Sequence, residues 1–251
     1  MSRYRASFIH LMISTALAGS VFGIIYWVWY PEPIFSIVGV LPIVLVLAGV
    51  NLGIGPLLTL VVYKYGKPGL KFDLCVIALM QIVALIYGSY RLYDEKPDYL
   101  VFAIDRLEFV SKKQIDQSTM QFDEAGTEHF AGLAMVFASP PEDPEAHQRY
   151  IDSVISDGKP DLESRPEFWA PWLAGADVIR QRIKPVEKIV PKTSDEQEKL
   201  RRAIAAYETD HPNLGVLPIG GIEKNLGMLL DRDSLEIIDI VEADPWTPAE
   251  T

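Results

Sequence analysis

Three long apolar runs occupy the first 93 residues of the chain, and few polar positions interrupt them. The runs cover residues 8–30, 34–63 and 74–93. A helix rises about 1.5 Å per residue, so about 20 residues cross a hydrocarbon core that is about 30 Å thick. Each run is long enough for this. The pattern therefore predicts an α-helical membrane anchor of three transmembrane helices over residues 1–93.

Two of these runs have features that complicate the simple pattern. The first contains Ala16-Leu17-Ala18, which is similar to a signal-peptidase site, but its apolar stretch continues beyond that point and favours an uncleaved anchor. The second run is longer than a perpendicular span needs and contains Pro42 and Pro56. We expect its surplus to form an interfacial first turn, a kink at Pro56, or a tilt.

The remaining residues, 94–251, alternate between strand-like and helix-like patterns. Strands are predicted at 99–104, 107–110, 132–138 and 214–219, with a hairpin formed by 226–230 and 235–241. Helices are predicted from Pro144, over about 172–183, and from Ser194 to Tyr207, where Ser194 begins a capping-box pattern. No βαβ unit repeats. An α+β soluble domain with a mainly antiparallel sheet is expected.

The charges divide at the same place as the hydrophobic pattern. Residues 1–93 carry a formal charge of +4 and residues 94–251 carry −15, which makes nucleic-acid binding a poor hypothesis. The basic residues of the short membrane-flanking segments are Arg3, Arg5, Lys64, Lys67 and Lys71, whereas the first loop has none. By the positive-inside bias, these segments face the cytoplasm, and three spans place the soluble domain on the other side.

Small and polar residues within the spans are the candidate binding residues. Gly49 and Gly53 are one helical turn apart, and such spacing allows a second helix to approach closely. They either pack the three spans together or form a groove for a partner's transmembrane helix. His10, Asn51, Thr59 and Gln81 should point inward, and we expect interhelical hydrogen bonds rather than an ion pathway. The candidate partner-helix site comprises Gly49, Asn51, Gly53, Pro56 and Gln81.

No catalytic residue, cofactor or metal site is predicted. The chain lacks the common nucleophile, phosphate-loop and zinc motifs, and its single cysteine, Cys75, excludes an intramolecular disulfide. Asp231, Asp233, Glu236 and Asp239 are spaced partly like a calcium loop, but Glu236 stands where that loop requires glycine. A solvated turn explains this acidic segment better.

Several segments resemble the TfpX/TfpZ family of type IV pilin accessory proteins. They are the run at 52–81, the strand-like segment at 99–110, the motifs at 141–145 and 158–162, and the closing Asp244-Pro245-Trp246. The similarity covers nearly the whole chain in order. It implies a bacterial inner-membrane protein with a cytoplasmic N-terminus and a periplasmic domain.

The same resemblance implies a non-enzymatic function that requires no cofactor. The protein is expected to bind its cognate major type IV pilin and to modulate pilus assembly or retraction, with inner-membrane lipid and the pilus assembly machinery as further partners. The alternative is a membrane-tethered periplasmic enzyme or ligand sensor. A transporter is disfavoured because the spans contain no chain of buried acids and bases.

Overall fold

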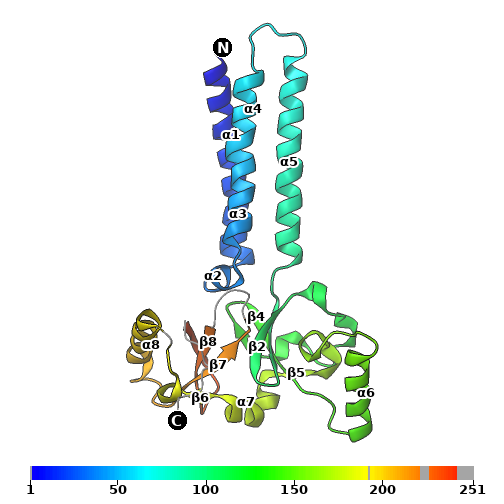
Figure 1. Ribbon diagram of the computed structural model, residues 1–251, viewed down its shortest axis with the longest axis vertical. Coiled ribbons are helices and arrows are strands. Elements are labelled where there is room, and N and C mark those ends of the chain that lie inside the picture. Colours follow the sequence, from blue (N-terminus) through cyan, green and yellow to red (C-terminus); the bar gives the residue numbers. More distant parts are fainter. Residues whose placement is uncertain (1, 192, 221–225, 242–251) are drawn as a thin grey trace. The chain divides into compact units, whose positions relative to one another are not determined.

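The computed structural model describes residues 2–191, 193–220 and 226–241, in two compact units made of residues 1–96 and 97–251 (Figure 1). The closing Asp244-Pro245-Trp246 segment lies outside the described residues. Each unit has its own core.

The first unit contains three helices that are long and apolar enough to cross a membrane, at Arg3–Trp29, Leu41–Val62 and Leu70–Asp94. The first consists of α1 (Arg3–Ile24) and a π-helical end, η1 (Ile25–Trp29). It begins earlier than its apolar run because the side chain of Ser2 caps it by accepting a hydrogen bond from the Arg5 N–H.

The second run is divided into several helical segments. A short helix, α2 (Ile34–Val38), ends at Gly39, whose positive φ of 72° stops it. The span itself is α3 (Leu41–Ala48), a π-helical segment η2 (Gly49–Ile54) and α4 (Gly55–Val62). The surplus length thus forms a separate first turn, and the region around Pro56 changes hydrogen-bond register.

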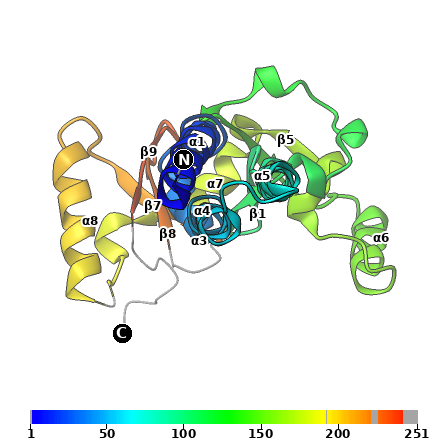
Figure 2. The same ribbon diagram turned by 90° about the horizontal axis from the view of Figure 1, so that it is seen from above.

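The third helix, α5 (Leu70–Asp94), follows a short loop. The second span packs against both α1 and α5 (Figures 1 and 2). Tyr30 helps to close one end of the unit, because its buried hydroxyl donates to the Leu92 carbonyl at 2.7 Å.

In the second unit, nine strands form one mixed sheet within the described residues. The main path runs β3-β4-β1-β2-β7-β8-β9, while β5 pairs with β4 and β6 with β7. The strands are β1 (Tyr99–Ala103), β2 (Arg106–Val110), β3 (His129–Phe130), β4 (Leu133–Ala138), β5 (Trp169–Pro171), β6 (Lys184–Pro185), β7 (Leu214–Ile219), β8 (Leu226–Asp231) and β9 (Ile237–Val241).

The expectation of a mainly antiparallel sheet is only partly right. β1 pairs with β4 in parallel over its full length, and β2 meets β7 in parallel at Leu107 and Ile219. Parallel neighbours require crossover connections rather than hairpins. The short 3-10 turns Lys112–Gln114, Gln117–Thr119 and Glu124–Gly126 lie within the first crossover.

Three helices accompany the sheet: α6 (Pro144–Ile155), α7 (Ala176–Arg182) and α8 (Ser194–Tyr207), with α6 and α8 at opposite ends of the unit (Figure 2). One sequence-based detail was wrong: Thr193, rather than Ser194, caps α8 by accepting from the Glu196 N–H. At the end of α6, Ile155 is 78% exposed.

The sheet is buried on both faces at its centre. All five residues of β1 are buried, and its alternate side chains enter two different layers. On one face, Tyr99 packs with Trp169; on the other, Phe102 contacts the rings of Phe137 and Trp172. A smaller cluster beneath α8 includes Leu200 and Val216. This burial explains the nearly continuous apolar sequence of β1.

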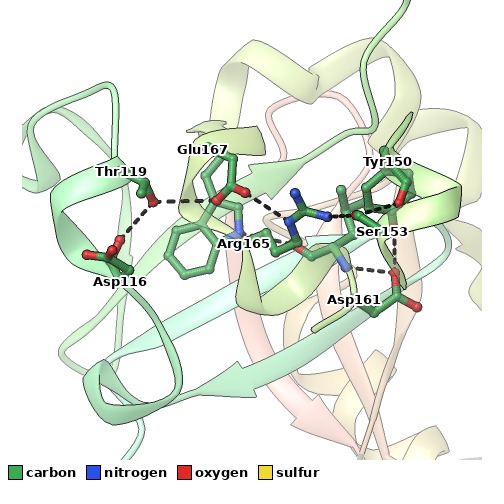
Figure 3. A network of polar contacts seen from close by, with 9 residues as sticks. Asp116, Thr119, Tyr150, Ser153, Asp161, Arg165 and Glu167 are labelled. Atoms are coloured by element: carbon green, nitrogen blue, oxygen red, sulfur yellow. Dashed lines mark hydrogen bonds and ion pairs between the residues drawn. The ribbon is translucent and has the colours of Figure 1, made fainter. Parts of the chain in front are cut away.

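Arg165 fastens α6 to the 3-10 turns that follow it (Figure 3). Its guanidinium donates to Ser153 Oγ at 2.7 Å and to Glu167 Oε1 at 2.9 Å. It also lies over the rings of Tyr150 and Phe168, 5.3 and 4.6 Å from their centroids. Because the side chain is only 12% exposed, these contacts are largely shielded from solvent.

Candidate functional site

A cluster of polar side chains joins the three long helices of the first unit. His10 of α1 lies between its two neighbours, with Nδ1 2.5 Å from Thr59 Oγ1 of α4 and Nε2 2.6 Å from Gln81 Oε1 of α5. Gln81 Nε2 lies 3.5 Å from Ser14 Oγ of α1. The predicted interhelical hydrogen bond of Gln81 is confirmed, and the inward placement of His10 and Thr59 explains how they avoid lipid.

The π-helical segment exposes one backbone carbonyl to this cluster. The Gly55 N–H donates to the Val50 carbonyl, so in the same register the donor to the Asn51 carbonyl would be residue 56. Residue 56 is proline, which has no N–H. Gln81 Nε2 instead donates to the Asn51 carbonyl at 2.8 Å. A buried carbonyl that would otherwise be orphaned is thereby satisfied from another helix.

The directions of the hydrogen bonds follow from the chemistry of the groups. Gln81 Oε1 can only accept, so His10 Nε2 carries a proton; in the neutral ring Nδ1 then accepts from the Thr59 hydroxyl. The Asn51 amide donates to the Leu47 carbonyl of its own span, so the interhelical hydrogen bond expected of the Asn51 side chain is not the one that the structure shows. The cluster is thus engaged internally, and its evident role is to hold three helices in one register.

A cavity of about 340 Å³ lies beside this cluster, between α1 and α5. We call it the α1–α5 groove. From α1 it is lined by Ala6, Ile9, His10, Ile13, Ser14 and Leu17; from α5 by Leu74, Ala78, Gln81 and Ile82; and from the second span by Asn51 and Thr59, with Tyr63 directly after that span. Its walls are largely apolar, and its polar floor is the hydrogen-bonded cluster.

The five predicted partner-helix residues fall into two groups. Asn51, Pro56 and Gln81 are buried within the unit. Gly49 is exposed and Gly53 is half-buried, and a Cβ atom at either would have no contacting atom within 4 Å. These two glycines therefore do not pack the three spans together, and their surface stays open.

Sequence reasoning missed the role of Gly55, one of two glycines at which a side chain of another helix approaches closely. A Cβ on Gly55 would lie 2.0 to 2.4 Å from the side-chain amide of Gln81, so only glycine admits this side chain. Gly88 has the same role against Leu47, at 2.3 Å. The only sequence signal for Gly55 was its position directly before Pro56.

The five predicted topology-setting basic residues lie at one end of the unit. Arg3 and Arg5 are in the first turns of α1, Lys64 and Lys67 are in the loop after α4, and Lys71 is in the first turn of α5. All five are exposed. Lys67 pairs with Asp73 at 2.6 Å.

In the second unit, the acidic turn beginning at Asp231 is held by hydrogen bonds. Asp231 Oδ1 accepts from the N–H groups of Asp233 and Ser234 and from the Ser234 hydroxyl. Burial alone would raise the pKa of Asp231, but these hydrogen bonds lower it below its usual value. Among the described residues, no group of three or more histidine, cysteine, aspartate or glutamate side chains is placed to hold a metal.

These features define a class of protein with a bundle of three apolar helices and a separate mixed-sheet domain. The model of the family "Fimbrial assembly protein FimB" matches residues 1–39. The "Fimbrial assembly protein, serogroup E1" of Dichelobacter nodosus is 25% identical over 96% of this chain and 95% of its own length. The "Fimbrial assembly protein, serogroups C1 and C2" of the same organism is 34% identical over 44% of this chain and 86% of its own length.

The chain belongs to the family of fimbrial assembly proteins. No solved structure matches it.

Proposed function

We propose that this protein is a non-enzymatic accessory factor of type IV fimbrial biogenesis, of the TfpX/TfpZ type, that binds its major pilin in the bacterial inner membrane. Its relatives in Dichelobacter nodosus, named fimbrial assembly proteins, support the fimbrial context. The basic end of the helical unit supports a cytoplasmic N-terminus, and three spans then give a periplasmic second unit. Binding would modulate pilin assembly into the pilus or its retraction.

The observation that carries the proposal is the open glycine surface of η2. Gly49 and Gly53 have free space above them, and on the same span Val46 and Leu57 are 67% and 61% exposed. Two small residues between larger apolar ones form a notch, in which the backbone of another helix can approach closely. The apolar membrane helix of a pilin suits such a notch.

The backbone beneath this glycine surface is held in place by three buried residues, Asn51, Pro56 and Gln81. Pro56 and the hydrogen bond between Gln81 and the Asn51 carbonyl maintain the π-helical register that carries both glycines. These three residues are therefore positioning residues rather than direct contacts.

Site-directed photocrosslinking in cells of the native host tests the proposal. A photoreactive residue at Gly49 or Gly53 should capture the major pilin, whereas one at Leu79 of α5, which is 61% exposed, should capture mainly lipid. Gly53→Leu should fill the notch and weaken co-purification of pilin, while Leu79→Val should not. Capture of lipid or of this protein alone from both glycine positions would contradict the proposal.

A further inference from the structure

We infer that the α1–α5 groove is a specific binding site for an anionic phospholipid, with one acyl chain between the helices and the headgroup at the basic end of the unit. This inference is independent of the pilin partner, because the groove lies between α1 and α5, while the notch lies on η2. It goes beyond the general contact that every membrane protein makes with lipid.

The length of the groove fits a single leaflet. Along α1 its lining extends from Ala6 to Leu17, which corresponds to about 16 Å of helix rise. This is about half of a 30 Å hydrocarbon core. On α5 the lining begins at Leu74 and reaches Gln81 and Ile82. The groove therefore extends from the end of the unit to about the middle of the bilayer.

The groove is apolar where an acyl chain would lie. Ile9, Ile13, Leu17 and Ile82 line it and are 43%, 63%, 46% and 42% exposed, so they present open apolar surface. Ala78 leaves room between them. The cavity of about 340 Å³ is within the range of ligand-sized pockets.

The polar groups at the floor of the groove already have hydrogen-bond partners within the protein. Both ring nitrogens of His10 are hydrogen-bonded, one to Thr59 and one to Gln81, and the Gln81 amide donates to the Asn51 carbonyl. A ligand inside the groove therefore gains little from bringing a polar group to this depth. The headgroup belongs at the other end.

That end is strongly basic. Arg3 and Arg5 precede Ala6 on α1, and Lys71 precedes Leu74 on α5. Within the described part of the chain, Arg3, Arg5, Lys64 and Lys71 make no ion pair, and Asp73 is the only acidic residue of the first turn of α5. The amino ends of α1 and α5 also point their partial positive charges toward this end, which favours an anion. Basic residues beside a groove between membrane helices suit an anionic headgroup.

Photolabelling of the full-length protein in lipid vesicles tests the inference. The vesicles consist of phosphatidylcholine with a minor share of phosphatidylglycerol and a trace of phosphatidylglycerol that carries a diazirine on one acyl chain. Labelled residues are mapped by mass spectrometry. We expect label to concentrate on Ile13, Leu17 and Ile82, and we expect unlabelled phosphatidylglycerol, but not phosphatidylcholine, to compete.

Two variants examine the two parts of the site. Ala78→Phe should fill the groove and remove the concentrated label, whereas Leu79→Phe, next to it on the exposed face of α5, should leave the label unchanged. The double variant Lys64→Gln/Lys71→Gln removes two exposed charges outside the lining of the groove and should reduce competition by phosphatidylglycerol about fivefold for each charge. Arg149→Gln in the second unit is its charge control.

Several results would overturn the inference. Label spread equally over groove residues and exposed residues such as Leu79 would show ordinary surrounding lipid. Equal competition by phosphatidylcholine would remove the anionic preference. A groove that stays unlabelled while Leu79 is labelled would show that lipid does not enter it, as when a protein helix fills it.

Discussion

The side-chain amide of Gln81 in the third span donates to the backbone carbonyl of Asn51 in the second span at 2.8 Å, although the two residues are 30 positions apart in the sequence. This bond exists because Pro56 has no N–H to offer to that carbonyl. Pro56 leaves the Asn51 carbonyl without a backbone donor, and the side-chain amide of Gln81 supplies one from another span. The π-helical segment can therefore be buried in an apolar environment without an unsatisfied carbonyl.

Replacing Gln81 by leucine should destabilise the full-length protein by about 1–2 kcal/mol, because it leaves the Asn51 carbonyl and His10 Nε2 without partners. Pro56→Ala restores an N–H beside the Asn51 carbonyl. The double variant should therefore lose about 1 kcal/mol less than the sum of the single losses. Thermal unfolding in detergent, followed by circular dichroism, measures this cycle; strictly additive effects would refute the coupling.

Gly55 and Gly53 should respond very differently to the same substitution. Gly55→Ala places a Cβ against the amide of Gln81 and should cost about 1–3 kcal/mol of stability. Gly53→Ala enters open space and should leave the thermal midpoint nearly unchanged. Both variants replace a glycine of the second span by alanine. An equal change of the thermal midpoint would therefore show that the close approach at Gly55 is absent.

Arg165 should contribute more to the second unit than an ordinary surface arginine. Arg165→Ala removes hydrogen bonds to Ser153 and Glu167 and the stacking on Phe168, and should destabilise the unit by about 2–3 kcal/mol. Arg165→Lys should recover only part of this loss, because an ammonium lacks the planar fork of donors.

Near-UV circular dichroism during urea unfolding of the full-length protein follows its ordered aromatic side chains, which include the buried Trp169 and Trp172 of the second unit. Arg149→Ala is the matched control, since the Arg149 side chain is 70% exposed and should change stability by less than about 0.5 kcal/mol. Equal effects of the two alanine variants would contradict the role of Arg165.

Glu108 should reduce stability at neutral pH. Burial, together with the nearby charges of Glu163 and Asp105, raises the pKa of Glu108 above the usual value of a glutamate, although Arg106 opposes this. The folded state therefore binds the proton more tightly than the unfolded state does. Stability is lost as the pH rises from the pKa of Glu108 in the unfolded chain through its higher pKa in the folded protein.

Glu108→Gln should accordingly raise the thermal midpoint at neutral pH. The difference from the natural chain should disappear below about pH 4, where the glutamate is protonated in both states. Thermal melts across this range measure the effect. A midpoint difference that does not depend on pH would show that protonation of Glu108 is not the cause.

Local sequence patterns identified most of the individual elements of the second unit. The alternating and continuous apolar runs predicted β1, β2, β4, β7 and the β8–β9 hairpin close to their observed bounds. The short strands β3, β5 and β6 were missed, because two or three residues are too few to show a period. The parallel pairing of β1 with β4 was missed as well, since strand direction depends on distant connections.

The sequence by itself determined three apolar spans, a charge boundary near residue 94 and the presence of buried polar groups within the spans, because length, hydrophobicity and charge are local properties. Only the tertiary structure decided which of these groups contact one another. The register change before Pro56 leaves the Asn51 carbonyl free to accept from Gln81, and the side chain of Gln81 packs against Gly55 rather than Gly53. Such pairings depend on helix rotation and backbone register, which a hydrophobic pattern does not encode.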